Sequence, residues 1–306
     1  MIIAIVGATA TGKTALSLEV AERLGGASAV EIISADAMQL YRGMDIGTAK
    51  LPLDERRGIA HHQIDVLDVR EEASVAAYQR SARADIADIQ ARGKIPIIVG
   101  GSGLYISAVL DKLDFPGHDP QIRAALEAQL ETEGIQPLLT ELKEKDPQAA
   151  AVIAPENTRR IIRALEVIRL TGKPFTPRFP RHTSHYEDVH SFLVTREKTL
   201  LDETIKQRTH TMFEQGLVEE TRHLLTQGLE QGRTASTAIG YAQAIEVIRG
   251  TMTLEEAEAA ITQATIKLTK KQGTWFRADK RLNVLDLSDG DIVGASNYIV
   301  KACTAI

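Results

Sequence analysis

The sequence GATATGKT occupies residues 7–14 and follows the apolar run IIAIV at residues 2–6. The octapeptide fits the phosphate-loop pattern G-x-x-x-x-G-K-[ST], and the apolar run before it is typical of a buried parallel strand. In such a loop the backbone amides turn toward an anion, the lysine adds positive charge and the final hydroxyl suits a magnesium ion. The predicted phosphate-binding residues are Gly7, Ala8, Thr9, Ala10, Thr11, Gly12, Lys13 and Thr14, with Thr14 as the Mg²⁺ ligand. The pattern leaves open whether the phosphate is consumed or only held.

Strand and helix patterns alternate through the first part of the chain. Strand-like runs lie at 29–33 and 95–99, and helical patterns lie at 14–24 and 74–92. This alternation predicts an α/β fold with a P-loop-type, doubly wound parallel sheet. Ligands of such sheets bind beyond the carboxyl ends of the strands. We therefore expect the loops 7–14, 34–41 and 100–105 to converge on one crevice.

The pattern changes to short helices from about residue 115. Asp119 and Pro120 predict a helix start, Gly134 predicts its end, and a tract rich in proline and histidine runs to about Tyr186. A strand-like run resumes at 190–195, helices dominate from residue 199, the longest of them at 253–276, and a last short strand is predicted at 283–287. We therefore expect a catalytic P-loop core of residues 1–115 and 189–306 and a helical insertion of residues 116–188.

The composition is that of an ordinary globular protein. The 306 residues are 43% hydrophobic and 25% charged, and no apolar run approaches the roughly 18 residues of a membrane span. The single cysteine, Cys303, argues against an internal disulfide and a multi-cysteine zinc site. These features predict a cytoplasmic protein with no membrane partner, and we expect a monomer.

Positive charge is concentrated in two stretches, although the whole chain has a net charge of −5. Residues 158–185 carry a net charge of +6, which includes Arg178 and Arg181, and residues 265–281 carry +5. Two basic stretches on an acidic chain predict a localised polyanionic partner. The alternative is that both stretches are solvated helix faces.

Two further motifs follow predicted strand ends. The sequence ISADAMQLYRGMDIGTAK at 33–50 places Asp36 three residues past a strand, and GGSGLY at 100–105 places the Ser102 hydroxyl after another. Both side chains are thereby predicted at the crevice, where Ser102 can hydrogen-bond a substrate. For Asp36 the alternatives are a helix N-cap or a carboxylate beside magnesium.

A pair of adjacent histidines invites a metal-site interpretation. His61 and His62 have only Asp65 near them in the sequence, and no second ligand cluster is evident. We therefore predict structural roles or RNA contact for the pair.

These motifs together resemble those of the bacterial tRNA dimethylallyltransferases, also called tRNA isopentenyltransferases. The resemblance spans nearly the whole chain. It is carried by GATATGKT (7–14), ISADAMQLYRGMDIGTAK (33–50), HHQID (61–65), GGSGLY (100–105), NTRRIIRALEV (157–167), IGY (239–241) and KKQGTW (270–275). Phosphate loops are common among nucleotide enzymes, whereas the second motif is nearly specific to this family.

The resemblance implies a defined reaction. Members of the family move a dimethylallyl group from dimethylallyl diphosphate to the exocyclic amine of the adenosine immediately 3′ of the anticodon in tRNA, giving N6-isopentenyladenosine. It implies that the phosphate loop and Mg²⁺ hold the leaving diphosphate and that Arg208 assists its departure. It also implies that Asp36 is the general base and that Ser102 orients the amine or the base.

The resemblance further implies an RNA-binding surface. The adenine must be flipped out of the anticodon loop, and the helical insertion is expected to clamp the anticodon stem-loop of the tRNA. The implied tRNA-binding residues are Asp36, Ala37, Met38, Gln39, Ser102, Arg123, Arg159, Arg160, Ile161, Ile162, Arg163, Gly240 and Tyr241.

Other functions share part of the pattern. A small-molecule kinase with Asp36 as the base toward a hydroxyl explains the sheet but not the basic helical insertion. A nucleotide-regulated RNA-binding module, in which the loop is only a switch, is the non-enzymatic alternative. Enzymes that prenylate free adenine nucleotides are closer relatives, and the long insertion argues against them.

Overall fold

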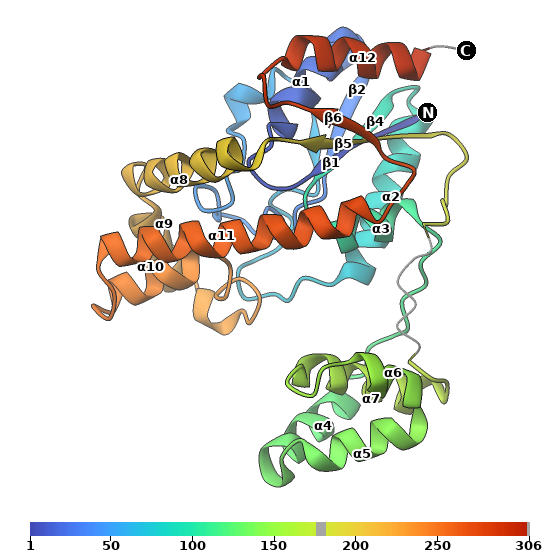
Figure 1. The fold of residues 1–306 in the computed structure, drawn as a ribbon, viewed down its shortest axis with the longest axis vertical. Helices are drawn as coiled ribbons and strands as arrows, with labels where there is room; N and C mark the ends of the chain where they lie inside the picture. Colours follow the sequence, from blue (N-terminus) through green and yellow to red (C-terminus); the bar gives the residue numbers. More distant parts are fainter. Residues whose placement is uncertain (176–181, 305–306) are drawn as a thin grey trace. The chain divides into compact units, whose positions relative to one another are not determined.

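Apolar runs of the sequence form the strands of one parallel sheet. The computed structural model describes residues 1–175 and 182–304. Its strands are β1 (Ile2–Gly7), β2 (Val30–Ser34), β3 (His61–His62), β4 (Ile95–Gly100), β5 (Val189–Thr195) and β6 (Asn283–Asp286). Their order is β3-β2-β4-β1-β5-β6, which confirms the predicted doubly wound α/β fold (Figure 1). The sequence does not predict β3, because two histidines give no apolar run.

Helices follow or precede each strand of the core. They are α1 (Lys13–Arg23), α2 (Val75–Ala91), α3 (Gly103–Leu110), α8 (Lys198–Glu214), α9 (Leu217–Thr226), α10 (Tyr241–Ile248), α11 (Leu254–Arg277) and α12 (Ile292–Thr304). The long helix α11 begins at a capping box, since the Thr253 hydroxyl accepts from the Glu256 amide and the Glu256 carboxylate accepts from the Thr253 amide. Among the described residues, no helix combines the length and apolar character that a membrane crossing needs.

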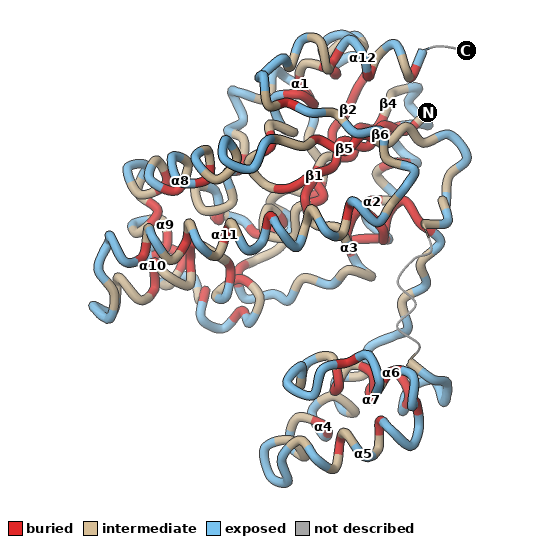
Figure 2. The backbone as a smooth tube through the Cα atoms, viewed as in Figure 1, coloured by how far each residue is buried: buried red, intermediate tan, exposed pale blue. Residues whose placement is uncertain are grey.

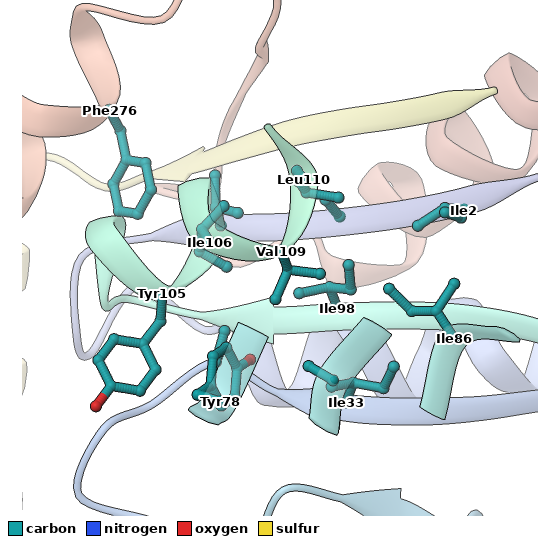
Figure 3. Close-up of a cluster of buried hydrophobic side chains, with 14 of the residues drawn as sticks. Ile2, Ile33, Tyr78, Ile86, Ile98, Tyr105, Ile106, Val109, Leu110 and Phe276 are labelled. Carbon is teal, nitrogen blue, oxygen red and sulfur yellow. The ribbon is translucent and has the colours of Figure 1, made fainter. Parts of the chain in front are cut away.

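Alternating side chains of the strands build a hydrophobic layer on each face of the sheet. Ile3 and Ile5 cluster with buried residues of α1 and α12. Ile2 and Ile98 cluster instead with α2, α3 and Phe276 of α11, and Figure 3 shows this second layer. Strands β1 and β2 are therefore buried along their whole length (Figure 2), and functional side chains are left to the loops at the strand ends.

A third hydrophobic cluster lies under the loop that follows β2. Tyr41 and Met44 of this loop are buried with Leu217 of α9, Tyr241 of α10 and Ile261 of α11. The second sequence motif is thus anchored by its own apolar residues, which fixes the backbone on which Asp36 sits.

Residue contacts separate the chain into a core of Met1–Asp111 and Ser184–Ile306 and an insertion of Lys112–Thr183. The insertion begins four residues before the predicted start at residue 116, and it ends five residues before the predicted end at residue 188. The reason is backbone pairing, because the Lys112 amide donates to the Thr183 carbonyl. Residues 176–181, with Arg178 and Arg181 of the first basic stretch, lie outside the described residues.

The insertion is a set of short helices around its own core. Its helices are α4 (Pro120–Glu133), α5 (Gln136–Lys145), α6 (Pro147–Val152) and α7 (Thr158–Thr171). Leu126 of α4, Leu138 of α5 and Leu165 of α7 are fully buried together. As predicted, Asp119 is the N-cap of α4, and its carboxylate accepts from the amides of Gln121 and Ile122.

A buried carboxylate organises the start of the insertion. The Glu166 side chain on α7 is fully buried and accepts from the Asp119 amide, from the His118 ring and from Arg163 at 2.9 Å. Burial by itself raises the pKa of Glu166, but the hydrogen bonds from Arg163 and His118 lower it more, so the net pKa is below its ordinary value. Arg163 also donates to the carbonyls of Pro116 and Gly117, so it is committed to holding this segment on α7.

We therefore predict that Arg163→Ala destabilises the insertion. The expected loss is about 1–3 kcal/mol of the free energy of unfolding, because Glu166 keeps its other donors and Arg163 is partly exposed. Hydrogen exchange of the α7 amides measures the effect. The matched control is Arg159→Ala on the same helix, since Arg159 is exposed and has no hydrogen bond or ion pair within the described residues. Equal protection of α7 in the two variants would contradict the structural role of Arg163.

Candidate active site

The carboxyl ends of the central strands surround one pocket of about 380 Å³. Its lining includes Lys13 after β1, Asp36 after β2 and Gly101 after β4, so the three predicted loops do converge. Arg208 of α8 and Arg196 after β5 line the same pocket. The pocket is therefore built from strand ends, where parallel sheets place their ligands.

The phosphate loop keeps its amide groups open toward this pocket. Gly12 precedes α1 with a left-handed φ of 95°, and no side chain caps the first amides of the helix. Within the loop, the Thr11 hydroxyl and the Lys13 ammonium both donate to the Ala8 carbonyl, at 2.9 and 2.5 Å. These bonds satisfy a carbonyl that otherwise repels an anion. Uncapped amides at a helix N-terminus form a ready site for phosphate.

Gly7 is required by close packing. A β carbon at this residue would clash with the Val194 carbonyl oxygen of β5, which pairs with Gly7 in the sheet. The absence of a side chain lets β1 turn directly into the loop while it stays paired with β5.

The pocket contains cations without carboxylate partners. Lys13 and Arg208 form no ion pair with any described residue. Burial lowers the pKa of Lys13 to about 8; Asp36 opposes this shift and Arg208 adds to it. Burial also lowers the pKa of Arg208, which Asp36 partly offsets. Since buried cations are costly unless they are paired, the pocket is arranged to receive an anion.

Asp36 lies at the pocket with one carboxylate oxygen committed. Its Oδ1 accepts from the Met38 amide at 2.9 Å, and the backbone that follows forms turns, so Asp36 is not a helix cap. No described cation pairs with the carboxylate. The second oxygen is thus left to serve as a hydrogen-bond acceptor or a base.

Ser102 holds the loop that carries Asp36. The Ser102 hydroxyl accepts from the Ala37 amide at 3.2 Å, and the Ser102 amide donates to the Ala35 carbonyl. Ser102 does not itself line the pocket, unlike its neighbours Gly100 and Gly101. In this structure its contacts are therefore those of a positioning residue for Asp36. Its predicted contact with the substrate remains a prediction.

The predicted RNA contacts at Gly240 and Tyr241 are not supported, because both residues are buried under the second motif. The Tyr241 hydroxyl donates to Glu220 and accepts from the Gly47 amide, and a β carbon at Gly47 would lie 2.5 Å from the Tyr241 ring. Glu220 also accepts from the Ile46 amide. Glu220 of α9 and Tyr241 of α10 thus hold the loop after β2.

The other predicted residues of this loop are partly exposed. Ala37, Met38 and Gln39 are each of intermediate exposure, and Gln39 lines the pocket. The Gln39 amide group bonds Ser34 and the Thr48 carbonyl. Gln39 can contact a bound base only if it gives up or shares these bonds.

The last motif, KKQGTW, braces the phosphate loop from α11. The Gln272 side-chain oxygen accepts from the Thr9 amide at 3.0 Å, and a β carbon at Gly101 would lie 2.7 Å from its nitrogen. A β carbon at Gly103 would clash with the Trp275 ring. Gly101 and Gly103 of GGSGLY are thus needed for close packing against α11. Gln272 is not among the predicted site residues, because its contact joins residues far apart in the chain.

The insertion residues predicted to bind RNA divide into two kinds. The side chains of Ile161 and Ile162 are buried in the insertion core, so they are not presented to a ligand in this structure, and the RNA contact of these residues stays a prediction. Arg163 is committed to Glu166, and Arg123 pairs with Glu127 at 3.0 Å. Arg159 is exposed and free of ion pairs within the described range, and Arg160 is partly exposed. Arg159 is therefore the predicted insertion residue that remains most available to a polyanion.

The histidine pair serves the core. The His61 ring bonds the Ile59 carbonyl and also lines the pocket, and burial lowers the pKa of His61. The His62 ring bonds the buried Glu31 at 2.8 Å. Residues 1–175 and 182–304 contain no group of three His, Cys, Asp or Glu side chains placed to hold a metal.

A magnesium ion that is bound together with a phosphate ligand needs fewer ligands from the protein than a metal held by side chains alone. Thr14 is exposed at the start of α1 and lines the pocket with Asp36. Mg²⁺ commonly takes most of its ligands from phosphate oxygens and water. The hydroxyl of Thr14 beside the open amides fits such an ion.

Family models match the chain along most of its length. The model described as IPP transferase matches residues 39–279, and the model described as isopentenyl transferase matches residues 1–71. These matches include both the pocket and the insertion.

Similar proteins are known in sequence and in structure. The tRNA dimethylallyltransferase of Salinispora arenicola is 49% identical over 301 residues, which cover 98% of this chain and 86% of that protein. The full-length tRNA isopentenylpyrophosphate transferase of Bacillus halodurans is 39% identical, with a TM-score of 0.71 and coverage of 99% and 96%. A eukaryotic dimethylallyltransferase acting on tRNA is 26% identical, with a TM-score of 0.82 and coverage of 98% and 77%. The chain therefore belongs to the tRNA dimethylallyltransferase family.

Proposed function

We propose that this protein transfers a dimethylallyl group from dimethylallyl diphosphate to the exocyclic amine of the adenosine immediately 3′ of the anticodon in tRNA. The observation that carries the proposal is one pocket in which an open phosphate loop, unpaired cations and the Asp36 carboxylate meet. A diphosphate leaving group needs the first two features, and an amine nucleophile needs the third. The membership of the chain in the family supports the same reaction.

The proposed reaction is a displacement at an allylic carbon. The bond between C1 of the allyl group and the bridging oxygen breaks, and its electron pair leaves with diphosphate. A bond forms between C1 and N6 of adenine, and Asp36 takes the proton that N6 loses. Adenine N6 is a poor nucleophile because its lone pair is delocalised, so removal of this proton assists the step. Lys13 and Arg208 stabilise the charge that grows on the diphosphate.

Magnesium would be held by the Thr14 hydroxyl together with oxygens of the diphosphate. When bound, the ion supplies positive charge that offsets the developing charge of the leaving group. We further propose a cytoplasmic location, because the proposed substrate is tRNA. We also propose that the protein is a monomer.

The function is tested by incubating the protein with unmodified tRNA and dimethylallyl diphosphate. Mass spectrometry of the nucleosides should show N6-isopentenyladenosine at the position 3′ of the anticodon, with release of diphosphate and no use of ATP. Release of ADP from ATP would point to a kinase instead. RNA binding without any product would favour a nucleotide-regulated binding module.

In the same assay we predict that Asp36→Asn lowers turnover by a factor of about 100 or more, which is the usual size of a general-base contribution. Asparagine keeps an oxygen for the Met38 amide, so the loop should stay folded and tRNA binding should persist. The matched control is Asp54→Asn, because Asp54 is exposed and does not line the pocket. Near wild-type turnover of Asp36→Asn would end the general-base assignment.

The lowered pKa of Lys13 predicts a pH dependence of diphosphate binding. Diphosphate binds the protonated lysine, so the affinity of the wild-type protein relative to Lys13→Arg should be level below pH 8 and fall above it, by about tenfold per pH unit, as the free protein loses this proton. Titration of inorganic diphosphate by calorimetry between about pH 6.5 and 9.5 measures this. Lys13→Arg should lack the break, because arginine stays charged. The ratio of the two affinities cancels the ionisation of diphosphate itself, and a ratio independent of pH would contradict the role of Lys13.

The basic face of α11 is the core surface that we propose for tRNA contact. Lys267, Lys270 and Lys271 are exposed, have no ion pair with a described residue, and are spaced to share one helix face. Replacing all three by Gln should weaken tRNA binding and reduce its log-log salt slope by about one unit per lost phosphate contact. Titrations of tRNA at several salt concentrations test this, with exposed Lys301→Gln on α12 as the control. An unchanged salt slope would show that this face of α11 is only solvated and does not contact tRNA.

A further inference from the structure

Arg196 lies beside the phosphate loop although it is remote from it in sequence. It directly follows β5, whose residue Val194 pairs with Gly7 at the end of β1. The two strands approach so closely here that Gly7 cannot carry a side chain. The chain therefore leaves β5 next to the point where the phosphate loop begins, and Arg196 lines the same pocket as Lys13 and Thr14.

The guanidinium of Arg196 has no partner within the described parts of the chain. It forms no ion pair and no hydrogen bond with these residues, and its Nε is buried without an acceptor. Buried donors of folded proteins nearly always have a partner, and arginine has five donors to satisfy. An arginine that lines a pocket and lacks an acceptor is therefore arranged for a ligand that brings acceptors with it.

Other arginines of the protein show what a structural role looks like. Arg83 donates to the carbonyls of Val109 and Asp111, and Arg92 pairs with Glu31 and Asp88. Both are tied to the fold by several bonds. Arg196 has no such bonds, so the fold gives no reason for its charge to be here.

The charges of the pocket identify the kind of ligand. The lining includes three cations, Lys13, Arg196 and Arg208, and one carboxylate, Asp36. None of the three cations forms an ion pair in residues 1–175 and 182–304. A compact anion with several charges balances this set, whereas a single phosphate ester of an RNA backbone supplies only one. Guanidinium groups bind phosphate oxygens by two parallel hydrogen bonds, which suits a terminal phosphate.

We propose that Arg196 is a third cationic ligand of the diphosphate, approaching from the β5 side of the pocket. This proposal rests on the proposed function of the pocket and adds a residue that the sequence motifs do not contain. Arg196 touches the leaving group in the complex. Together with Lys13 and Arg208 it stabilises the negative charge that develops on the diphosphate.

The test compares Arg196→Gln, Arg196→Lys and the control Arg80→Gln. Arg80 is exposed on α2, outside the pocket lining and without ion pairs among the described residues, so its variant has the same change in net charge. Calorimetry with inorganic diphosphate should show an affinity about 10 to 100 times lower for Arg196→Gln and unchanged for Arg80→Gln. Arg196→Lys should lie between, since it keeps the charge and loses the paired hydrogen bonds. Thermal melts should show that all variants are folded.

Two further readouts separate the alternatives. The KM for dimethylallyl diphosphate should rise in Arg196→Gln while the Kd for tRNA stays at the wild-type value. Unchanged diphosphate affinity in Arg196→Gln would overturn the proposal, and so would a loss confined to tRNA binding, which would assign Arg196 to an RNA phosphate. If the wild-type protein binds diphosphate but makes no prenylated adenosine, the proposed function fails while the Arg196 comparison still stands on the binding data.

Discussion

The approach of β1 to β5 at Gly7 is the constraint on which the pocket depends. Because no side chain fits between Gly7 and the Val194 carbonyl, β1 keeps its pairing to its last residue and then turns at once into the phosphate loop. The phosphate loop then leads into the uncapped start of α1. The same contact fixes the end of β5, and thereby the position of Arg196 after it. One close backbone contact thus places both the open amides and a neighbouring arginine at one edge of the sheet.

Much of the fold can be predicted because its signals are local. The apolar runs at β1, β2, β4 and β5 and the capping box of α11 lie within a few residues of the elements they predict. Lys13 and Asp36 also belong to local motifs, whereas Arg208 is assigned through the family resemblance, and all three line the pocket. The rest depends on contacts between distant segments. The bond between Thr9 and Gln272 spans 263 positions, and β3 is held by pairing with β2 and not by its own sequence.

The motifs mix residues that face the pocket with residues that hold them there. Asp36 faces the pocket, whereas Ser102 and Tyr241 bind the backbone of the loop that carries it. In the insertion, Ile161 is core and Arg163 is committed to Glu166. A shared sequence pattern therefore indicates which segments build a site, and only the contacts show which side chains are left for a ligand.

The Glu166 network also changes how the charge of the insertion should be counted. The net charge of +6 for residues 158–185 already subtracts Glu166, but it does not show that this acid is buried inside the protein, where it holds Arg163 and the His118 ring. Arg169 is neutralised in the same way by Glu141. The electric field that draws a polyanion from a distance comes from the uncompensated remainder. Among the described residues of the insertion, the positive charge that is left for a polyanion is accordingly centred on few side chains such as Arg159.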